Sequence, residues 1–414
     1  MFKLPLIKKT ETSILEDHSN VIALDIGTEQ LKTLLFSAND LGINIEKVSR
    51  ISQQQHAMKS GIITNLDTVL DNCKLSISDI TSHLATEDYP KSIVMGIAGE
   101  YIQGVSIVVN YQREENFEKE VTQKEQEKII SQIKQTIVQN GKEDLSQRTG
   151  LTNEDIEILH ITSTGMEIGG MPVNSLVGYK GRDVKLHFYA SFAPKTYVEA
   201  LKKIGTELNM KVLGIVSQPF AVARSFMGSK NKDFSAIFID IGGGTTDIAI
   251  VEKGNVVETK IFAFGGRTFT KEISKILNLD YRYSEQRKLK YAQKGLDKEL
   301  SRNVQKIVYP VARLWMKTLK AAFESCEDID TFPTKIYLCG GGSLLPEIKE
   351  VMLEFPWKRY LPFPVVPKIE FYTPDKLESV TDNSGDLKNI FDITPAALAQ
   401  FAYNKEISKH NIDL

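Results

Sequence analysis

The chain has 414 residues, of which 42% are hydrophobic and 25% charged, with a formal net charge of −2. This length is too great for one ordinary hydrophobic core, so two or three domains are expected. The near-neutral charge disfavours a nucleic-acid-binding protein, and three widely spaced cysteines without a CxxC pattern disfavour a structural zinc or a disulfide framework. No apolar run reaches the roughly 20 residues that a membrane-spanning helix needs, so we expect a cytoplasmic protein.

The first clear structural signal is an apolar strand, residues 21–28, that ends in Asp25 and a turn at Gly27 and Thr28. A second apolar strand, residues 31–36, runs back from this turn. Glycine has no Cβ, so its backbone can reach positive φ and come close to a ligand. Successive backbone N–H groups in such a turn can point into one concavity that binds phosphate oxygens. The hairpin therefore predicts a phosphate-facing turn.

The first lobe continues to about residue 100, and the character of the sequence then changes up to about residue 190. Largely helical spacing of apolar residues predicts a helix over residues 66–84, and an apolar strand follows at residues 92–98. Residues 113–148 are strongly charged and rich in glutamine, with isoleucines on one helical face, and short strand signals flank them. These features predict a small α+β insert between about residues 100 and 190, whose charged stretch faces solvent.

A second hairpin resembles the first but has a longer glycine turn. A helix over residues 196–208, a strand over 212–216 and a helix beginning at Gln218 precede it. Two apolar strands then span residues 238–251, and Asp240 lies at the end of the first of them. The turn between them consists of Gly242, Gly243, Gly244, Thr245 and Thr246.

A third glycine-rich strand end follows in the C-terminal part of the chain. Residues 284–325 are mostly helical and charged, and an apolar strand spans residues 335–339. The strand runs directly into Gly340, Gly341, Gly342 and Ser343.

The two Asp-Ile-Gly hairpins and the third glycine turn, in this order and spacing, resemble the actin-like ATPase superfamily. That superfamily includes actin, the 70-kDa heat-shock chaperones and sugar kinases, in which two ribonuclease-H-like lobes close on ATP. The resemblance implies an α/β fold of two such lobes around a nucleotide cleft.

The resemblance also implies roles for individual residues. Asp25 and Asp240 would hold a hydrated Mg²⁺ through its waters, since magnesium keeps most of its water ligands. Glu285 would reach the ribose and Lys288 the base, although a solvated helix with charges three residues apart explains this pair as well. The residues expected to bind ATP are Gly27, Thr28, Gly242, Gly243, Gly244, Thr245, Thr246, Glu285, Lys288, Gly340, Gly341, Gly342 and Ser343.

Gln218 stands where many members of the superfamily have a glutamate, before a proline at the start of a helix. A carboxylate there could act as a base, whereas a glutamine can only orient water. We therefore expect at most a weak or slow ATPase that works as a nucleotide-dependent switch. A capping or packing role for Gln218 is the alternative.

The position of the insert resembles that of subdomain 1C in the bacterial division protein FtsA. Residues 59–67, 165–181 and 264–270 are also similar to FtsA segments. The resemblance implies nucleotide-dependent filaments and docking to FtsZ or another protein of the divisome at the septum. Residues 212–224 look at least as similar to PilM, of type IV pilus assembly, which binds a peptide of an inner-membrane partner. A PilM-like role is therefore the alternative.

A carbohydrate kinase is a lower alternative, because neither Asp183 nor Asp233 follows a glycine-rich apolar strand as its catalytic aspartate should. A chaperone would need a long peptide-binding domain after residue 404.

FtsA proteins usually end in an amphipathic membrane-binding helix, but residues 405–414 have too little apolar area for that purpose. We expect contact with the inner membrane's cytoplasmic face only through a partner or weakly through the N-terminus.

The expected division is a flexible lead (1–20), the first lobe (21–100), the insert (101–190), the second lobe (191–362), a return to the first lobe (363–404) and a tail (405–414).

Overall fold

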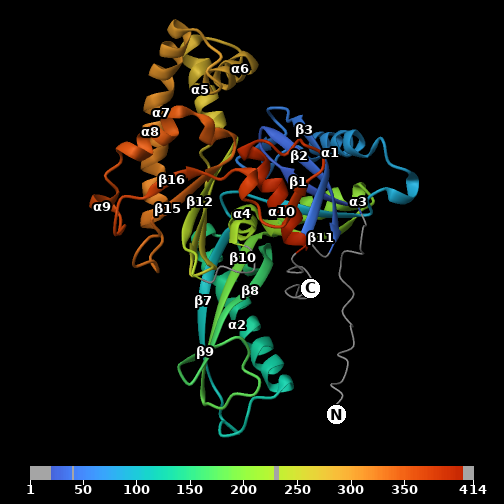
Figure 1. The fold of residues 1–414 in the computed structure, drawn as a ribbon, viewed down its shortest axis with the longest axis vertical. Coiled ribbons are helices and arrows are strands. Elements are labelled where there is room, and N and C mark those ends of the chain that lie inside the picture. Colours follow the sequence, from blue (N-terminus) through green and yellow to red (C-terminus); the bar gives the residue numbers. More distant parts are fainter. Residues whose placement is uncertain (1–19, 40–41, 228–232, 404–414) are drawn as a thin grey trace, which may run out of the picture.

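The structure is a computed structural model, and it describes residues 20–39, 42–227 and 233–403. The expected lead, apart from Asn20, and the expected tail lie outside these ranges. The described chain forms a six-stranded sheet, a nine-stranded sheet and a two-stranded ribbon. Figure 1 shows two bodies side by side in its upper part and an arm that projects below them.

The six-stranded sheet has the strand order β11-β6-β1-β2-β3-β17. Its strand β1 pairs antiparallel with β2 and parallel with β6. Alternate residues of β1 enter different cores, because successive side chains of a strand point to opposite faces. Helices α1 and α3 cover one face, and α4 and α10 cover the other. The bounds are β1 (Val21–Ile26), β2 (Gln30–Asn39), β3 (Gly42–Ser52), β6 (Ser92–Ile97), β11 (Lys211–Ser217), β17 (Val380–Asp382), α1 (Leu66–Thr81), α3 (Lys195–Glu207), α4 (Gln218–Met227) and α10 (Ile393–Tyr403).

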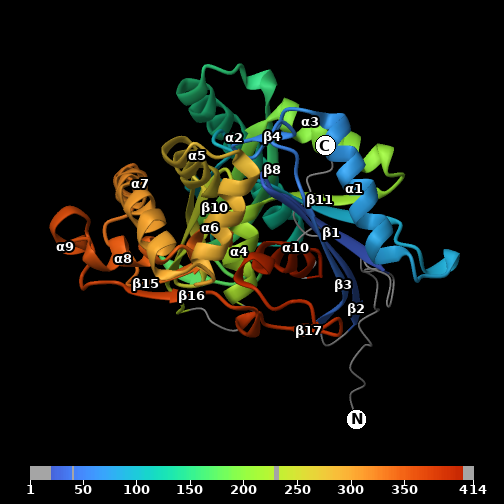
Figure 2. The same ribbon diagram turned by 90° about the horizontal axis from the view of Figure 1, so that it is seen from above.

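The second-lobe part of the nine-stranded sheet has the order β16-β15-β12-β13-β14. Its inner face packs on α4 and α10, so these two helices lie between the sheets, as Figure 2 shows. Its outer face packs mainly on α7 and α8, with α5 and α6 beyond them at the top of Figure 1. The bounds are β12 (Ala236–Ile241), β13 (Thr246–Glu252), β14 (Asn255–Phe262), β15 (Lys335–Cys339), β16 (Lys368–Phe371), α5 (Gly266–Leu277), α6 (Tyr281–Ala292), α7 (Lys298–Glu324) and α8 (Pro346–Glu354).

The arm consists of one long helix on four strands, which extend the nine-stranded sheet in the order β7-β10-β8-β9. It has its own hydrophobic core. Strand β7 joins the arm to β14 at Gly104, where an added Cβ would lie 1.8 Å from the Tyr189 hydroxyl, so the junction requires glycine. The bounds are β7 (Gln103–Gln112), α2 (Gln123–Thr149), β8 (Ile156–Ile168), β9 (Met171–Val173) and β10 (Asp183–Pro194); the short elements are β4 (Met58–Lys59), β5 (Ile62–Ile63) and α9 (Trp357–Tyr360).

Two expected boundaries differ from the structure. Strand β16, expected in the return to the first lobe (363–404), pairs parallel with β15 of the second lobe. We predict residues 191–362 as the second lobe, but α3 and β11 belong to the first body, because β11 pairs parallel with β6. The chain enters the second-lobe part of the nine-stranded sheet only after α4. Within the described ranges, no helix is long and apolar enough to cross a membrane.

Candidate functional site

The turns of the two Asp-Ile-Gly hairpins meet, although they belong to different sheets. A Cβ added to Gly243 would lie 2.5 Å from Cγ of Glu29, and one added to Gly244 would lie 2.5 Å from Oγ1 of Thr28. Real side chains cannot approach so closely. The first turn therefore packs directly on the second, and only glycine permits this contact.

A lysine outside the predicted site residues pairs with the carboxylate at the end of the first hairpin's first strand. Lys32 is the antiparallel partner of Asp25, and its Nζ lies 2.8 Å from Oδ2 of Asp25. Burial lowers the pKa of Lys32, but the neighbouring carboxylates of Asp25 and Asp240 outweigh that effect and raise it overall. Lys32 is thus a largely buried cation that pairs with Asp25 and is influenced by the charge of Asp240. The signal that could have revealed it is a lone lysine inside an otherwise apolar strand.

Gln218 begins α4 and points at the same carboxylate. Its Nε2 donates to Oδ1 of Asp25 at 2.9 Å, so both oxygens of Asp25 have partners. Gln218 is 7% exposed, and a Cβ on the neighbouring Gly96 would lie 2.9 Å from its Cγ. The glutamine is therefore held in the site by packing as well as by its hydrogen bond.

The second hairpin carries two paired acids, the partly buried Asp240 and the buried Asp247. Thr394 donates to Oδ2 of Asp240 at 2.5 Å. Burial raises the pKa of Asp240, and Asp25 raises it further, whereas Lys32 opposes the shift. Asp247, the strand partner of Asp240, has a pKa well above its usual range because of burial and of Asp240.

Asp247 therefore holds a proton more readily than an ordinary aspartate. Asp247 is not among the predicted site residues and lies only within the predicted strand of the second hairpin. Its position opposite Asp240 in the antiparallel pair is the signal that could have identified it.

The third glycine turn packs against the end of β12. Gly340 has φ of +79°, and an added Cβ would lie 2.0 Å from Oδ1 of Asp240. A Cβ on Gly342 would lie 2.5 Å from Cγ2 of Ile241, whereas Gly341 has open space around it. Ser343 donates to the carbonyl of Gly340 at 2.7 Å. All three predicted glycine turns therefore converge on Asp240 or its neighbours.

Glu285 and Lys288 belong to α6, and Lys288 reaches the start of α5 beside the second turn. Lys288 Nζ is 2.8 Å from Glu285 and donates to the Gly266 carbonyl at 3.1 Å. The backbone N–H of Gly266 in turn donates to the Gly242 carbonyl at 2.9 Å. Lys288 is only 6% exposed, so the pair is not a solvated helix face.

The side chain of Thr246 is turned into the second-lobe core. Its hydroxyl is fully buried, donates to the Phe264 carbonyl at 2.6 Å and accepts from Nε1 of Trp315 at 3.0 Å. The hydroxyl is therefore committed to the second-lobe core. Strand alternation places Thr245 and Asp247 on the opposite face.

The aspartates suit a hydrated magnesium ion better than a directly bound one. In the described part of the chain, no cluster of three or more histidine, cysteine or acidic residues could hold a metal. Both oxygens of Asp25 and one of Asp240 already accept hydrogen bonds from side chains. Carboxylates in such a setting can hold Mg²⁺ through its waters.

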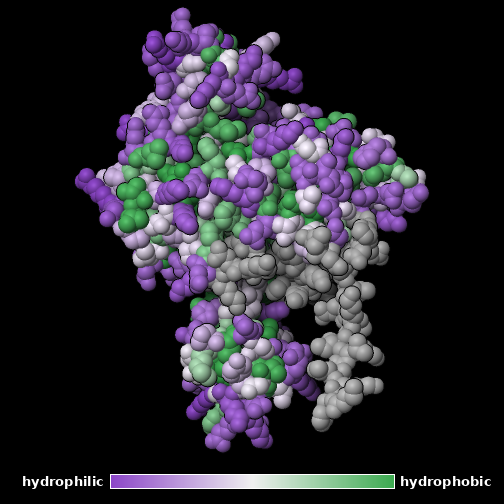
Figure 3. Space-filling model, viewed as in Figure 1, coloured by the Kyte–Doolittle hydropathy of each residue, from purple (hydrophilic) through white to green (hydrophobic). Residues whose placement is uncertain are grey.

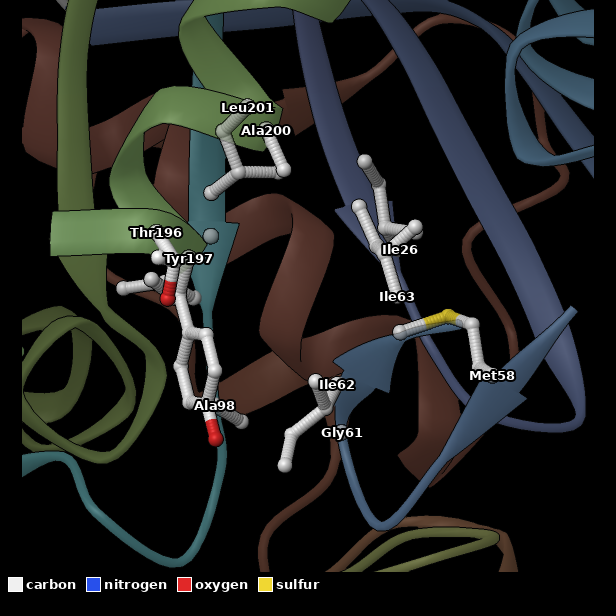
Figure 4. Close-up of a pocket in the computed structure, with 12 residues that line it drawn as sticks. Ile26, Met58, Gly61, Ile62, Ile63, Ala98, Thr196, Tyr197, Ala200 and Leu201 are labelled. Atoms are coloured by element: carbon white, nitrogen blue, oxygen red, sulfur yellow. The ribbon is translucent and has the colours of Figure 1, made fainter. Parts of the chain in front are cut away.

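A pocket lies behind the first turn, on the outer side of the six-stranded sheet. Figure 4 shows the ring of Tyr197 on one wall and the side chains of Ile26 and Met58 on the other. Its lining is mainly apolar, and no lysine or arginine contributes to it. Such a lining does not suit phosphate. The remaining lining residues are Gly61, Ile62, Ile63, Gly96, Ile97, Ala98, Thr196, Ala200 and Leu201.

Comparison with known proteins relates this geometry to a family. Residues 237–379 match the family described as cell division protein FtsA. The FtsA of Neisseria meningitidis serogroup B is 25% identical over 67% of this chain and 63% of its own length. The FtsA of Enterococcus hirae is 21% identical over 91% of this chain and 86% of its own length. For the relatives from N. meningitidis, Streptococcus pneumoniae and Pseudomonas aeruginosa, the match spans 55–63% of their length.

Among solved structures, the PilM-PilN type IV pilus biogenesis complex is similar with a TM-score of 0.67. The match covers 92% of this chain and 98% of the other, at 14% identity, so the likeness is one of fold alone. The expected actin-like ATPase fold is confirmed.

Proposed function

We propose that this chain is an ATP-binding cytoskeletal protein of bacterial cell division. The proposal starts from its similarity to the FtsA cell division proteins and from its actin-like ATPase fold. The observation that carries the proposal is the meeting of the two glycine turns beside Asp25, Lys32 and Asp240. Two backbone turns and a buried cation supply the groups that bind a polyphosphate.

In this proposal the phosphates lie between the first and second turns, where the backbone N–H groups of Gly27, Thr28 and residues 242–245 bind them. Lys32 would supply a positive charge, and Asp25 and Asp240 would hold a hydrated Mg²⁺ that offsets the charge of the phosphates. Adenosine lies against Gly340–Ser343, within reach of Glu285 and Lys288. Because the two turns are in contact, the sheets must separate slightly for a nucleotide to enter.

Hydrolysis is slow in this proposal. An amide cannot accept the proton of an attacking water, and the amide of Gln218 already donates to Asp25. The protein therefore acts as a switch that is set by bound nucleotide, and a weak ATPase at most.

The partners follow from the FtsA relationship. The chain docks FtsZ or another divisome protein, self-associates into filaments and works at the cytoplasmic face of the inner membrane. A PilM-like role in type IV pilus assembly is the second candidate, because the overall fold is close to that of PilM. A carbohydrate kinase fits poorly, since Asp183 lies at the outer end of the arm and Asp233 is exposed before β12.

Isothermal titration with ATP, with and without MgCl₂, tests the nucleotide site. Asp240→Ala should abolish ATP binding or remove its dependence on Mg²⁺, while Asp144→Ala, on the exposed side of α2, should leave both unchanged. Unaltered Mg-ATP affinity in Asp240→Ala would refute the site. Co-pelleting with FtsZ, compared with binding to a cytoplasmic pilus-assembly peptide, separates the two cellular roles.

A further inference from the structure

Arg267 belongs to the second lobe, but its side chain binds the first. It lies in the first turn of α5, where its backbone N–H donates to the Gly243 carbonyl at 2.8 Å. Its guanidinium pairs with the carboxylate of Glu29, and Nη2 donates to the Thr28 carbonyl at 2.7 Å. Both of these partners belong to the turn of the first hairpin.

The same guanidinium reaches a second first-lobe segment. Nη1 donates to the Met58 carbonyl at 2.6 Å and to the Gln55 carbonyl at 3.2 Å. The Arg267 side chain is 11% exposed, so these bonds are largely shielded from water. Hydrogen bonds from a charged donor are stronger than neutral ones, and a planar guanidinium fixes their geometry.

Glu29 is held by a further second-lobe group. The hydroxyl of Tyr281, the first residue of α6, donates to Oε1 of Glu29 at 2.7 Å. The methylene groups of Glu29 lie directly over Gly243. Glu29 thus lies where the two glycine turns touch, and side chains from α5 and α6 both bind it.

We infer that Arg267, Glu29 and Tyr281 form a latch between the lobes, which holds the two glycine turns together and limits the rate at which nucleotide enters and leaves. The control of nucleotide exchange rests on the proposed nucleotide function, whereas the latch itself does not. The turns are too close for phosphate to lie between them while the latch is closed. Every opening must therefore break the Arg267–Glu29 pair and its accompanying bonds.

The first test measures lobe separation without nucleotide. Spin labels at Lys74→Cys on α1 and Lys275→Cys on α5 place one label on each lobe; both lysines are exposed, and the surface around α5 is hydrophilic (Figure 3). The native cysteines are buried, which favours labelling at the two new sites. Pulsed electron paramagnetic resonance should give one narrow distance distribution for the parent protein and a longer or broader one for Glu29→Gln, Arg267→Gln and Tyr281→Phe.

The second test measures release of methylanthraniloyl-ADP after mixing with excess ADP. Glu29→Gln should release the nucleotide about tenfold faster or more, which corresponds to loss of a charge-assisted hydrogen bond. Glu125→Gln is the matched control, because it alters an arginine–glutamate pair with Arg113 inside the arm. It should change neither the distance nor the release rate.

An unchanged distance distribution in both Glu29→Gln and Tyr281→Phe, two variants that retain side-chain shape, would overturn the latch. Unchanged release rates in these variants would overturn its control of nucleotide exchange. If the parent protein binds no nucleotide but the latch variants still open, the proposed function fails and the latch stands.

Discussion

The side-chain amide of Gln218 donates to Oδ1 of Asp25 at 2.9 Å, across the boundary between α4 and β1. The other oxygen of Asp25 accepts from Lys32. Asp25 is 2% exposed, so it has almost no water with which to replace a lost partner. Gln218 therefore stabilises a buried carboxylate, whatever else it does.

Gln218→Glu should lower stability, because it replaces a donor with a second carboxylate next to Asp25. We expect a loss of about 1–3 kcal/mol at pH 8, measured by denaturant unfolding. Burial raises the pKa of the introduced carboxyl above its unfolded value, so the penalty should disappear as the pH falls and the protonated carboxyl can donate again.

Gln139→Glu is the matched control for this change. Gln139 also donates to a carboxylate, that of Glu143, but on the exposed face of α2. Equal losses in the two variants would show that burial of the Gln218–Asp25 pair has no energetic importance.

Gly340→Ala should be far more damaging than Gly341→Ala. Gly340 has φ of +79°, and its added Cβ would lie 2.0 Å from Oδ1 of Asp240, whereas Gly341 has open space around it. Backbone strain alone should destabilise Gly340→Ala by about 1–3 kcal/mol, and displacement of Asp240 adds to this. Thermal unfolding of the two variants measures the difference, and equal melting temperatures would contradict the packing of this turn on Asp240.

Local patterns were sufficient to predict the strands and turns around the site. The apolar runs before Asp25 and Asp240 lie in β1 and β12, and their glycine turns face each other as the resemblance implied. The charged stretch with isoleucines on one face is helix α2, whose buried residues include Ile129, Ile133 and Ile137. Each of these features depends on residues close together in the sequence.

Features that depend on pairing between distant segments were not predicted. The apolar run of β11 looks the same in either lobe, and only its parallel pairing with β6 assigns it to the first body. Lys32 and Arg267 were missed because their partners are brought to them by the fold. Arg267, for example, binds Thr28 and Glu29, which precede it by more than 200 residues.

Lys32→Met should destabilise the protein strongly at neutral pH. It leaves the buried carboxylate of Asp25 without its cation, and breaking such a buried pair typically costs about 3–5 kcal/mol. The folded pKa of Lys32 lies above its unfolded value of 10.5, so its stabilisation is complete below pH 10.5 and is lost as the pH rises through the folded pKa. The difference between the parent and Lys32→Met should therefore be constant near neutrality and shrink at alkaline pH.

Lys195→Met is the control for this experiment, because Lys195 makes only an exposed pair with Glu199. Chemical denaturation from pH 6 upward measures both variants. A loss in Lys32→Met no larger than that in Lys195→Met would contradict the pairing of Lys32 with the buried carboxylate of Asp25.

Asp247→Asn should raise stability at neutral and mildly alkaline pH. Asp247 is 4% exposed, and among the described residues its Oδ1 has no hydrogen-bond partner. Its folded pKa lies well above the usual 3.8, so the folded protein binds a proton that the unfolded chain releases. The contribution of Asp247 to stability therefore falls as the pH rises from about 3.8 toward the folded pKa.

The amide in Asp247→Asn carries no charge, so the stability of this variant should lack that part of the pH dependence. Unfolding free energies of parent and variant should be closest near pH 4 and diverge in favour of the variant as the pH rises. Asp71→Asn, at an exposed position of α1, should follow the parent at every pH. If Asp247→Asn were less stable than the parent by the same amount at every pH, the prediction would fail. The Asp247 carboxyl would then stabilise the fold through its hydrogen bonds, and its burial would carry no penalty.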